Sequence, residues 1–339
     1  MKTLHVAVIG TGSIGSRHVA VLQQIRGVVP IAISVSANRA YLNERVLAAS
    51  SVAEAAAIGA TLCVVSTDTG RHAADARMAA AYGLDVLVEK PLDVDAVQGN
   101  RLCEQVSESG RRLYVGYVLR FSESLNLFRQ LRMCLGSLHS VRIECQSYLP
   151  EWRQKRPYRE SYSARAEEGG VLRDLSHEID YAGWLFGWPK TLQANIINHD
   201  RLGIMSEEAV DLLWEGSDGC CVSMRLDYLS RPARRRMIAA GELGTLEWDA
   251  VTGVVTLSLV GEDPVTHKVD QTRDDMFTEE HRAFISACQE KHGDADDPRL
   301  VTGEEGLRTL SVCDAARRAG SSRREESVDY FYEADTSSL

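Results

Sequence analysis

The sequence predicts an α/β protein with a parallel sheet in its N-terminal part and an antiparallel sheet in its C-terminal part. From residue 4 to about residue 117, short apolar runs alternate with alanine-rich stretches of helical character, which is typical of strand–helix–strand units. After residue 117, apolar and polar residues alternate one by one in longer runs separated by turn glycines. This single alternation predicts antiparallel strands with one buried face.

The length of the chain predicts two domains, because 339 residues exceed the ~100 to 200 residues that one core usually supports. We place the first domain at residues 1–120 and the second at residues 121–330. Residues 331–339, which end in EADTSSL, are expected to form a loose tail.

Charge and composition argue against several classes of function. A formal net charge of -10 disfavours nucleic acid as a partner, because a phosphate backbone is itself negative. No apolar run approaches the ~20 residues that span a bilayer, and the start of the chain lacks the pattern of a secretory signal. The eight cysteines are scattered without a C-x-x-C pair, so we expect reduced thiols, no metal site and a cytoplasmic location.

In the N-terminal part, apolar runs predict buried parallel strands, and the alanine-rich stretches between them predict crossover helices. The runs are LHVAVIG, VPIAIS, TLCVVST, DVLVEKP and RLYVGY, and the clearest helical stretches are RHAADARMAAAYG and VDAVQGNRLCEQVSESG. Together they predict one parallel sheet.

In the C-terminal part, a helix is expected at ESLNLFRQLRMCLG, and alternating runs follow it as strands. Cys220 and Cys221 are adjacent within one such run, so we expect their side chains on opposite faces of a strand. Two more helices, at about residues 276–290 and 303–319, close the fold. The strand runs are SVRIECQSYL, LQANIINHD, EAVDLLWEG, CCVSMRLDYL, RRRMIAAGE, GTLEWDA and VVTLSLVG.

Three glycines directly after the first strand indicate a dinucleotide site. Gly10, Gly12 and Gly15 form the pattern G-x-G-x-x-G at the start of a predicted helix. The first glycine permits a tight turn, the second lets a pyrophosphate approach the backbone, and the third lets helix and strand pack closely. The helix N-terminus, with Ser13 and Ile14, then offers N–H donors to the anion. The alternative interpretation is a glycine-rich turn without a ligand.

The end of the second strand leaves the choice between NAD and NADP open. An acidic residue ~20 residues after the glycines would bind the ribose 2′-hydroxyl, but residues 32–41 (AISVSANRAY) contain none. Ser36 and Arg39 could instead bind the 2′-phosphate of NADP. Alternatively, Arg39 is solvated at a strand end and NAD binds without an acidic partner.

Glu89 and Lys90 stand at the end of a buried parallel strand, and open α/β sheets hold their ligands at this edge. A lysine there could orient a substrate hydroxyl and stabilise the alkoxide that forms as hydride leaves. Alternatively, the two residues are an ordinary surface pair.

Asp174, His177 and Asp180 recur at every third residue ahead of an apolar helical run. At this spacing they share roughly one helix face, so a carboxylate could fix the imidazole tautomer. His177 is then a candidate general base, because an ordinary histidine pKa of ~6.5 suits proton transfer near neutrality. The alternatives are a capping histidine beside exposed acids, and a metal triad that no further ligand cluster supports.

Residues 147–163 (SYLPEWRQKRPYRESYS) are dense in aromatic and basic side chains. Aromatic faces stack on sugar rings, and arginine forks bind carboxylates or phosphates. The segment is therefore a candidate substrate loop, or alternatively a dimer-interface loop. The substrate candidates in it are Trp152, Arg153, Tyr158, Arg159 and Tyr162, and Lys155 and Arg156 add charge that could meet an anionic group.

The order of these motifs resembles the Gfo/Idh/MocA oxidoreductase family along nearly the whole chain. G-x-G-x-x-G, then EKP, then D-x-x-H-x-x-D follow one another at separations like those of the family. STDTGRHAADARMAAAYGLDVLVEKPL is similar to the family stretch T-P-x-x-x-H that leads to EKP, with His72 at the histidine and Asp68 in place of the usual proline. GYVLRF, GELGTLEWD and GEEGLRTLSVCDAARRAG are similar to further family landmarks.

The resemblance implies an N-terminal Rossmann fold with a parallel sheet and a C-terminal α/β domain with a large open antiparallel sheet. That sheet is often used for contacts between copies, so a homo-dimer or homo-tetramer is expected. The family pattern also implies that Thr67, His72, Glu89 and Lys90 join the cofactor site, and that Arg120 of GYVLRF and Asp180 join the substrate site.

By the same resemblance, Lys90 orients the substrate, Asp174 is a carboxylate partner and His177 removes the hydroxyl proton. The chain departs from the commoner family pattern D-x-G-x-H, because DLSH has one residue fewer between acid and histidine. Asp180 is therefore a second candidate partner for His177.

These expectations converge on hydride transfer between NADP or NAD and a secondary hydroxyl or ketone. The substrate would be a sugar, a sugar nucleotide or a cyclitol, and a weaker resemblance to a branch of the family linked to surface polysaccharides or unusual sugars favours a sugar-type substrate. Two alternatives remain, a dinucleotide-sensing regulatory protein without turnover and an NAD-dependent, redox-assisted glycosidase.

Overall fold

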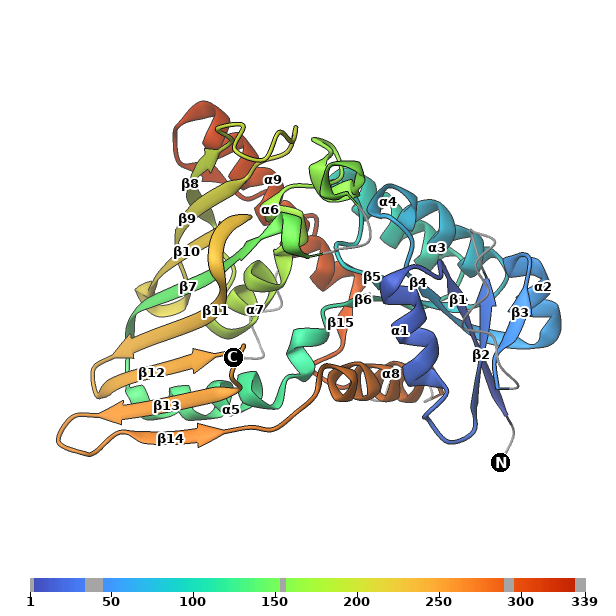
Figure 1. Ribbon diagram of the computed structural model, residues 1–339, viewed down its shortest axis with the longest axis horizontal. Helices are drawn as coiled ribbons and strands as arrows, with labels where there is room; N and C mark the ends of the chain where they lie inside the picture. The colour runs from blue at the N-terminus through green and yellow to red at the C-terminus, as the bar shows by residue number, and fades with distance from the viewer. Residues whose placement is uncertain (1–2, 34–44, 153–156, 290–295, 333–339) are drawn as a thin grey trace. The chain divides into compact units, whose positions relative to one another are not determined.

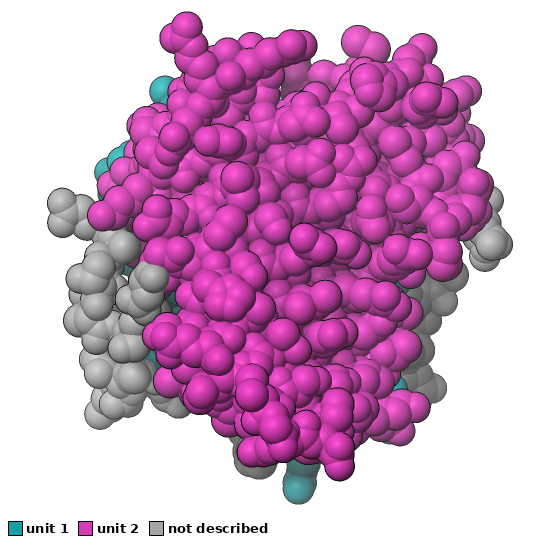
Figure 2. Space-filling model, turned by 90° about the vertical axis from the view of Figure 1, so that its left-hand side faces the viewer, with its two compact units in different colours: residues 1–121, 272–307 teal, residues 122–271, 308–339 magenta. Residues whose placement is uncertain are grey.

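The computed structural model describes residues 3–33, 45–152, 157–289 and 296–332, except for the side chain of Asp218. The chain forms two compact units, which Figure 2 shows in different colours. Unit 1 comprises residues 1–121 and 272–307, and unit 2 comprises residues 122–271 and 308–339.

This division differs from the expected one, because residues 272–307 belong to unit 1 and not to the second domain. The cause is helix α8 (Arg273–Gln289). Its Phe284 is buried in the core of unit 1 with Val6 and Leu87, and its Phe277 is buried against Val21 and Val118. The chain thus returns to the first core after leaving it.

Unit 1 contains a seven-stranded sheet in the order β15-β6-β5-β4-β1-β2-β3. All its pairings are parallel except that of β15 with β6, which confirms the predicted parallel sheet. The strands are β1 (Leu4–Ile9), β2 (Val28–Ile33), β3 (Leu47–Ala49), β4 (Ala60–Val65), β5 (Asp85–Glu89), β6 (Leu113–Gly116) and β15 (Val301–Thr302).

Helices of unit 1 pack in pairs, α1 with α8 and α3 with α4 (Figure 1). Side chains of α1 and α8 share a core with Val6, Val8 and Val64 of the sheet. Ser51 and Asp95 cap α2 and α4 by accepting hydrogen bonds from the backbone N–H groups of the first turn. The helices are α1 (Ser13–Leu22), α2 (Val52–Ile58), α3 (His72–Ala81) and α4 (Ala96–Glu108), with the 3-10 turns η1 (Thr69–Arg71) and η2 (Val118–Phe121).

Unit 2 contains a nine-stranded sheet in the order β14-β13-β12-β11-β7-β10-β9-β8-β16. The sheet is mixed and not wholly antiparallel, because β7 and β10 run parallel at its centre. Cys220 is buried and Cys221 exposed, as strand alternation predicts. The strands are β7 (Leu138–Tyr148), β8 (Thr191–Ile197), β9 (Ala209–Glu215), β10 (Cys221–Asp227), β11 (Leu229–Gly241), β12 (Gly244–Asp249), β13 (Val254–Leu259), β14 (Val265–Lys268) and β16 (Glu326–Ser327).

One face of this sheet is covered by helices. Tyr181 of α7 meets the buried ring of Trp248 edge to face, with centroids 5.5 Å apart, and the indole N–H of Trp248 donates to Ser124 Oγ at 2.9 Å. Arg235 of β11 and the fully buried Glu178 of α7 form an ion pair at 2.7 Å. The helices of unit 2 are α5 (Glu123–Leu131), α6 (Val171–Asp174), α7 (Ser176–Phe186) and, from residue 308 on, α9 (Gly303–Ser322), and its 3-10 turns are η3 (Arg132–Leu135), η4 (Leu149–Glu151), η5 (Tyr158–Glu160), η6 (Tyr162–Ala164) and η7 (Ser217–Gly219).

Within the described ranges, no helix has both the length and the apolar character needed to cross a membrane. The same part of the chain holds no group of three or more His, Cys, Asp or Glu side chains placed to bind a metal ion.

The glycines of the first turn provide a matched test of the packing. A Cβ on Gly15 would lie 1.8 Å from Gly10 O, whereas a Cβ on Gly12 would meet nothing within 4 Å. We expect Gly15→Ala to lower the free energy of unfolding by about 1 to 3 kcal/mol through overpacking, and Gly12→Ala to lower it by less than about 1 kcal/mol. Urea denaturation of the dinucleotide-free protein measures both. Equal losses would contradict the packing described.

Candidate active site

The glycine turn of unit 1 has the geometry that a dinucleotide requires. Gly10 follows β1 with a φ of 86°, and a Cβ there would lie 2.8 Å from Ser66 O. Gly12 is the N-cap of α1, whose first turn carries no acidic side chain and receives no side-chain cap in this described segment. The N–H groups of Ser13 and Ile14 therefore begin a helix whose positive end is open to an anion. The turn fits a pyrophosphate.

The residues predicted to choose between NAD and NADP, Ser36 and Arg39, lie outside the described residues.

Glu89 ends β5 and is held by hydrogen bonds on both carboxylate oxygens. His18 Nε2 lies 2.9 Å from Oε1, and the backbone N–H of Lys90 donates to Oε2 at 3.2 Å. Burial raises the pKa of Glu89, but the hydrogen bond and charge of His18, together with the charges of Lys90 and His72, hold that pKa below its usual value. Glu89 is therefore an anion beside the half-buried Lys90.

The side chains of His72 and Thr67, predicted at the cofactor site, are engaged within unit 1. Thr67 Oγ1 donates to Asp75 Oδ2 at 2.8 Å. The buried His72 places Nδ1 2.8 Å from Pro91 O and Nε2 3.0 Å from Thr67 O. Arg120, predicted at the substrate site, is buried in η2 with Glu305 at 3.4 Å.

Asp174 and His177 lie on two different helices of unit 2, which corrects the prediction of one continuous helix face. Helix α6 ends at Asp174, Leu175 follows with φ -101° and ψ 30°, and α7 begins at Ser176. Asp174 and Asp180 are 5% and 1% exposed, so the alternative of a capping histidine beside exposed acids is wrong. His177 is half-buried at the start of α7.

Tyr228 is a candidate site residue that the sequence did not reveal. Its hydroxyl donates to Asp174 Oδ2 at 2.6 Å, and the ring of Trp152 meets it edge to face at 5.3 Å. Burial, followed by the charge of Asp174, raises the pKa of Tyr228 well above its usual value, so Tyr228 remains a donor. The signal in the sequence was an aromatic residue near the end of the predicted strand run CCVSMRLDYL.

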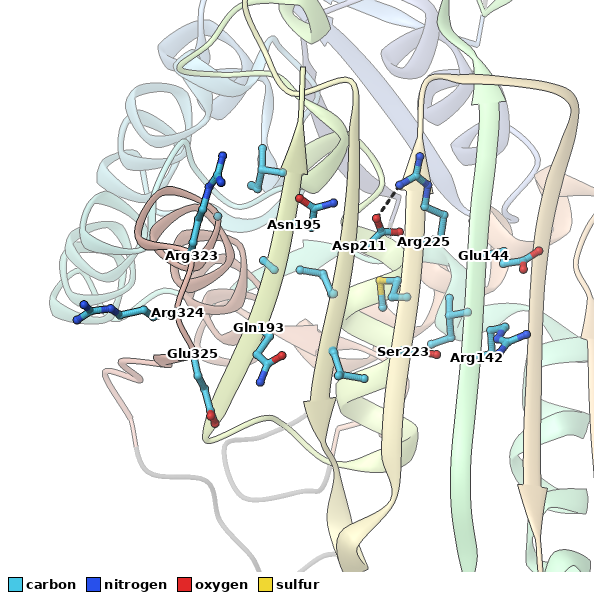
Figure 3. A pocket seen from close by; sticks show the side chains of 17 residues that line it. Arg142, Glu144, Gln193, Asn195, Asp211, Ser223, Arg225, Arg323, Arg324 and Glu325 are labelled. Carbon is cyan, nitrogen blue, oxygen red and sulfur yellow. Dashed lines mark hydrogen bonds and ion pairs between the residues drawn. The ribbon is translucent and has the colours of Figure 1, made fainter. Parts of the chain in front are cut away.

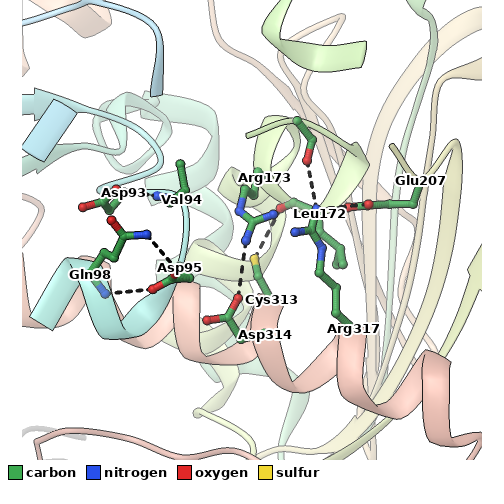
Figure 4. Close-up of polar contacts among 11 residues, drawn as sticks. Asp93, Val94, Asp95, Gln98, Leu172, Arg173, Glu207, Cys313, Asp314 and Arg317 are labelled. Atoms are coloured by element: carbon green, nitrogen blue, oxygen red, sulfur yellow. Dashed lines mark hydrogen bonds and ion pairs between the residues drawn. The ribbon is translucent and has the colours of Figure 1, made fainter. Parts of the chain in front are cut away.

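Buried charges support helix α6 from beneath (Figure 4). Arg173 lies 3.5 Å from Asp314 of α9, and Arg317 of α9 lies 3.0 Å from Glu207. Gly170, with a φ of 92°, is close to Glu207, because a Cβ there would meet its carboxylate at 2.2 Å. These contacts fix the residue that precedes α6, and through it Asp174.

The structure describes most of the aromatic and basic segment at residues 147–163. Trp152 Nε1 donates to Ser147 Oγ at 2.9 Å. Tyr158 Oη and Arg159 Nε both approach Leu202 O, at 2.9 and 3.0 Å. Tyr162 lies half-buried in η6. The other basic candidates, Arg153, Lys155 and Arg156, lie outside the described residues.

Glu207 provides a pH-dependent test of this arrangement. Burial raises the pKa of Glu207 from 4.5 to about 7, although the charge of Arg173 opposes that rise. The folded chain then holds the proton of Glu207 more tightly than the unfolded chain. The contribution of Glu207 to the free energy of unfolding is therefore complete below pH 4.5 and is lost as the pH rises to about 7. We expect the free energy of unfolding of Glu207→Gln to rise by about 1 to 3 kcal/mol relative to that of the wild type as the pH rises across this range.

Urea denaturation of both proteins at several pH values measures the difference. Glu167→Gln, which replaces an exposed glutamate nearby in the sequence, is the matched control and should follow the wild type. An equal pH dependence for Glu207→Gln and the wild type would contradict the assignment.

Comparison with known proteins places both parts of the chain in one family. Residues 4–117 match the model described as "Oxidoreductase family, NAD-binding Rossmann fold", and residues 133–247 match the GFO/IDH/MocA C-terminal domain. The inositol 2-dehydrogenase of Rhizobium meliloti (strain 1021) is 24% identical over 96% of this chain and 99% of its own length. The scyllo-inositol 2-dehydrogenase (NADP(+)) of Bacillus subtilis (strain 168) is 30% identical, over only 40% of this chain and 37% of its own length.

Among solved structures, levoglucosan dehydrogenase in complex with NADH and L-sorbose has a similar fold. It superposes with a TM-score of 0.83 at 16% identity and covers 98% of this chain and 100% of its own. With the glycine turn, the EKP segment and the two family domains in order, the chain belongs to the Gfo/Idh/MocA family of NAD-binding oxidoreductases.

Proposed function

We propose that the protein is an NAD(P)-dependent dehydrogenase that acts on a secondary hydroxyl of a sugar, sugar nucleotide or cyclitol, or reduces the matching ketone. The observation that carries the proposal is the open N-terminus of α1 behind Gly12. It lies at the carboxyl edge of the same parallel sheet that presents Lys90 directly after β5, where open α/β sheets bind their ligands. Family relatives that act on inositols support the class of substrate.

The residues proposed to hold the dinucleotide are those of the glycine turn and the neighbouring strand end. The backbone N–H groups of the first turn of α1 bind the pyrophosphate, and Ser36 and Arg39 are proposed to admit NADP as well as NAD. A bound nicotinamide supplies the hydride acceptor. The proposed set is Gly10, Gly12, Ser13, Ile14, Gly15 and Thr67, with Glu89 and His72 supporting Lys90 beside it.

Three side chains are proposed to serve the chemistry. The ammonium group of Lys90 donates to the substrate oxygen and stabilises negative charge on it as the hydride leaves. His177 accepts the hydroxyl proton. Asp174, whose position Tyr228 fixes by a hydrogen bond of 2.6 Å, is the carboxylate partner, and Asp180 is the second candidate for that role.

Substitution tests these roles with matched controls. We expect Lys90→Ala and His177→Ala each to lower kcat/KM by about 100-fold or more, because each removes a group used in the transition state. The affinity for the dinucleotide, measured by nicotinamide fluorescence, should change by less than about threefold. Lys190→Ala and His139→Ala make the same changes at exposed positions and should leave turnover intact.

Turnover is followed at the nicotinamide absorbance band with a panel of inositols, sugars and sugar nucleotides, using NAD and NADP in parallel. Full activity in either variant would remove that residue from the mechanism. Tight dinucleotide binding by the wild type without turnover on any substrate would favour a regulatory protein instead.

We also propose that copies of the chain associate through the outer face of the unit 2 sheet. This face carries a hollow of about 950 Å³, in which side chains of β7, β8, β9 and β10 point outward (Figure 3). Its charges have both signs, and Arg225 and Asp211 pair at 2.8 Å. Leu213 is 41% exposed among them. A face with both charges and exposed apolar area suits a second copy of itself.

The assembly is tested by size. We expect Leu213→Arg to shift the protein to a smaller species in light scattering after gel filtration, because it places a charge in the apolar part of the contact. Met78→Arg, at an exposed position of α3 in unit 1, should leave the size unchanged. An unchanged mass for Leu213→Arg would locate any association elsewhere.

The compartment is proposed from the cysteines. Cys134 and Cys221 are exposed and free, which suits the reducing environment of the cytoplasm.

A further inference from the structure

Lys90 stands between two residues that are each held by a buried histidine of unit 1. Glu89 is bound by His18 of α1, and Pro91 is bound by His72 of α3. We propose that His18 and His72 are positioning residues that together fix the backbone on both sides of Lys90. The inference rests on the proposed function in one respect, namely that Lys90 orients the substrate.

The first support runs from α8 through α1 to the backbone of Lys90. His281 Nε2 lies 2.9 Å from His18 Nδ1, and His18 Nε2 lies 2.9 Å from Glu89 Oε1. The other oxygen of Glu89 accepts the N–H of Lys90 at 3.2 Å. Both histidines are fully buried, and Phe277 meets the His18 ring edge to face at 5.2 Å. The imidazole of His18 therefore has one fixed orientation.

The negative charge on this support is carried by Glu89. Glu280 of α8 is buried with it, and burial and the charge of Glu89 raise the pKa of Glu280 well above its usual value. Neither carboxyl oxygen of Glu280 has a hydrogen-bond partner among the described residues. Glu280 is thus a neutral acid, and the single anion of the cluster is the carboxylate that binds Lys90 N–H.

The second support has a different chemistry, because His72 lies between two carbonyl oxygens. Its Nδ1 is 2.8 Å from Pro91 O and its Nε2 is 3.0 Å from Thr67 O. A carbonyl oxygen only accepts hydrogen bonds, so both ring nitrogens must donate, and only the imidazolium form has two N–H groups. His72 is therefore a buried cation, and the charges of Glu89 and Asp93 interact with it.

His72 links two strand ends of the same sheet. Thr67 follows β4, and Pro91 follows β5, and these strands are parallel neighbours. The hydrogen bond at Pro91 acts directly on the chain that carries Lys90, whereas the bond at Thr67 anchors the histidine itself. Misplacing a catalytic group by about 1 Å can lower the rate about 100-fold. Loss of the hydrogen bond at Pro91 should therefore lower kcat.

The two nitrogens of each histidine can be tested separately. The amide nitrogen of asparagine takes the place of Nδ1, and that of glutamine takes the place of Nε2. His72→Asn therefore keeps the bond to Pro91 and His72→Gln loses it. At His18 the order is reversed, because His18→Gln keeps the bond to Glu89 and His18→Asn keeps only the contact with His281.

We expect the same two substitutions to rank oppositely at the two positions. His72→Asn and His18→Gln should retain kcat within about fivefold, and His72→Gln and His18→Asn should lose about 10- to 100-fold. Dinucleotide affinity should stay within about threefold throughout, which separates positioning of Lys90 from cofactor binding. The same rank order at both positions, or no loss in either pair, would overturn the proposal.

Two measurements on the full chain need no turnover, and they separate this inference from the proposed function. Nitrogen-15 NMR of the imidazole rings should show His72 doubly protonated near neutral pH. Hydrogen exchange read by mass spectrometry should rise at the backbone amides of Glu89 and Lys90 in His72→Gln and His18→Asn only. If the wild type turns over no substrate but both results hold, the support stands and the proposed function fails. Equal exchange in all four variants overturns the support itself, and a neutral His72 ring overturns the assignment of His72 as a cation.

Discussion

The close approach of α1 to the end of β1 is the contact on which the arrangement of unit 1 depends. With Gly15 so near Gly10 O that a Cβ would lie 1.8 Å away, the helix enters directly over the strand end. This entry leaves the first N–H groups of α1 open to an anion. It also sets His18, which lies one turn further along the same helix, against Glu89. One packing contact thus serves both the dinucleotide turn and the segment that carries Lys90.

In unit 2, the backbone of two adjacent glycines comes comparably close to neighbouring groups. A Cβ on Gly169 would lie 2.3 Å from Tyr162 O, and one on Gly170 would lie 2.2 Å from Glu207 Oε1. The glycine pair lets α6 start close to the sheet, so that Asp174 reaches Tyr228 directly after β10. The following helix is held separately by the buried pair of Glu178 and Arg235. A buried pair of this kind stabilises little by itself, but it is costly to break on one side.

The sequence revealed most of unit 1, since strands buried on both faces stand out as apolar runs and the glycine spacing belongs to one kind of turn. It did not reveal β3 or β15, which are three and two residues long and too short for periodicity. Nor could it assign α8 to unit 1, because the apolar face of a helix shows that it is buried but not which core buries it. The parallel pairing of β7 with β10 was missed for the same reason, since alternation fixes the buried face of a strand and not its neighbour.

At the candidate site too, the sequence predicts which residues are involved better than it predicts contacts between distant segments. A spacing of three residues suits one helix, but it also suits two short helices with Leu175 between them, and only the packing of Gly170 decides. Two partners of predicted residues lie far away in the sequence. Tyr228 is 54 residues from Asp174, and His18 is 71 residues from Glu89. No local pattern marks such pairs.

The charge of a buried histidine is a further property that the partners determine and the sequence does not. Two carbonyl oxygens select the imidazolium at His72. At His18 the two partners are instead a carboxylate and a second imidazole. The same residue type therefore takes two roles at one sheet edge, one as a cation that ties backbone to backbone and one as a link that ties a carboxylate to a helix. Lys90 lies between them, and its backbone is restrained from both sides by groups that belong to different helices.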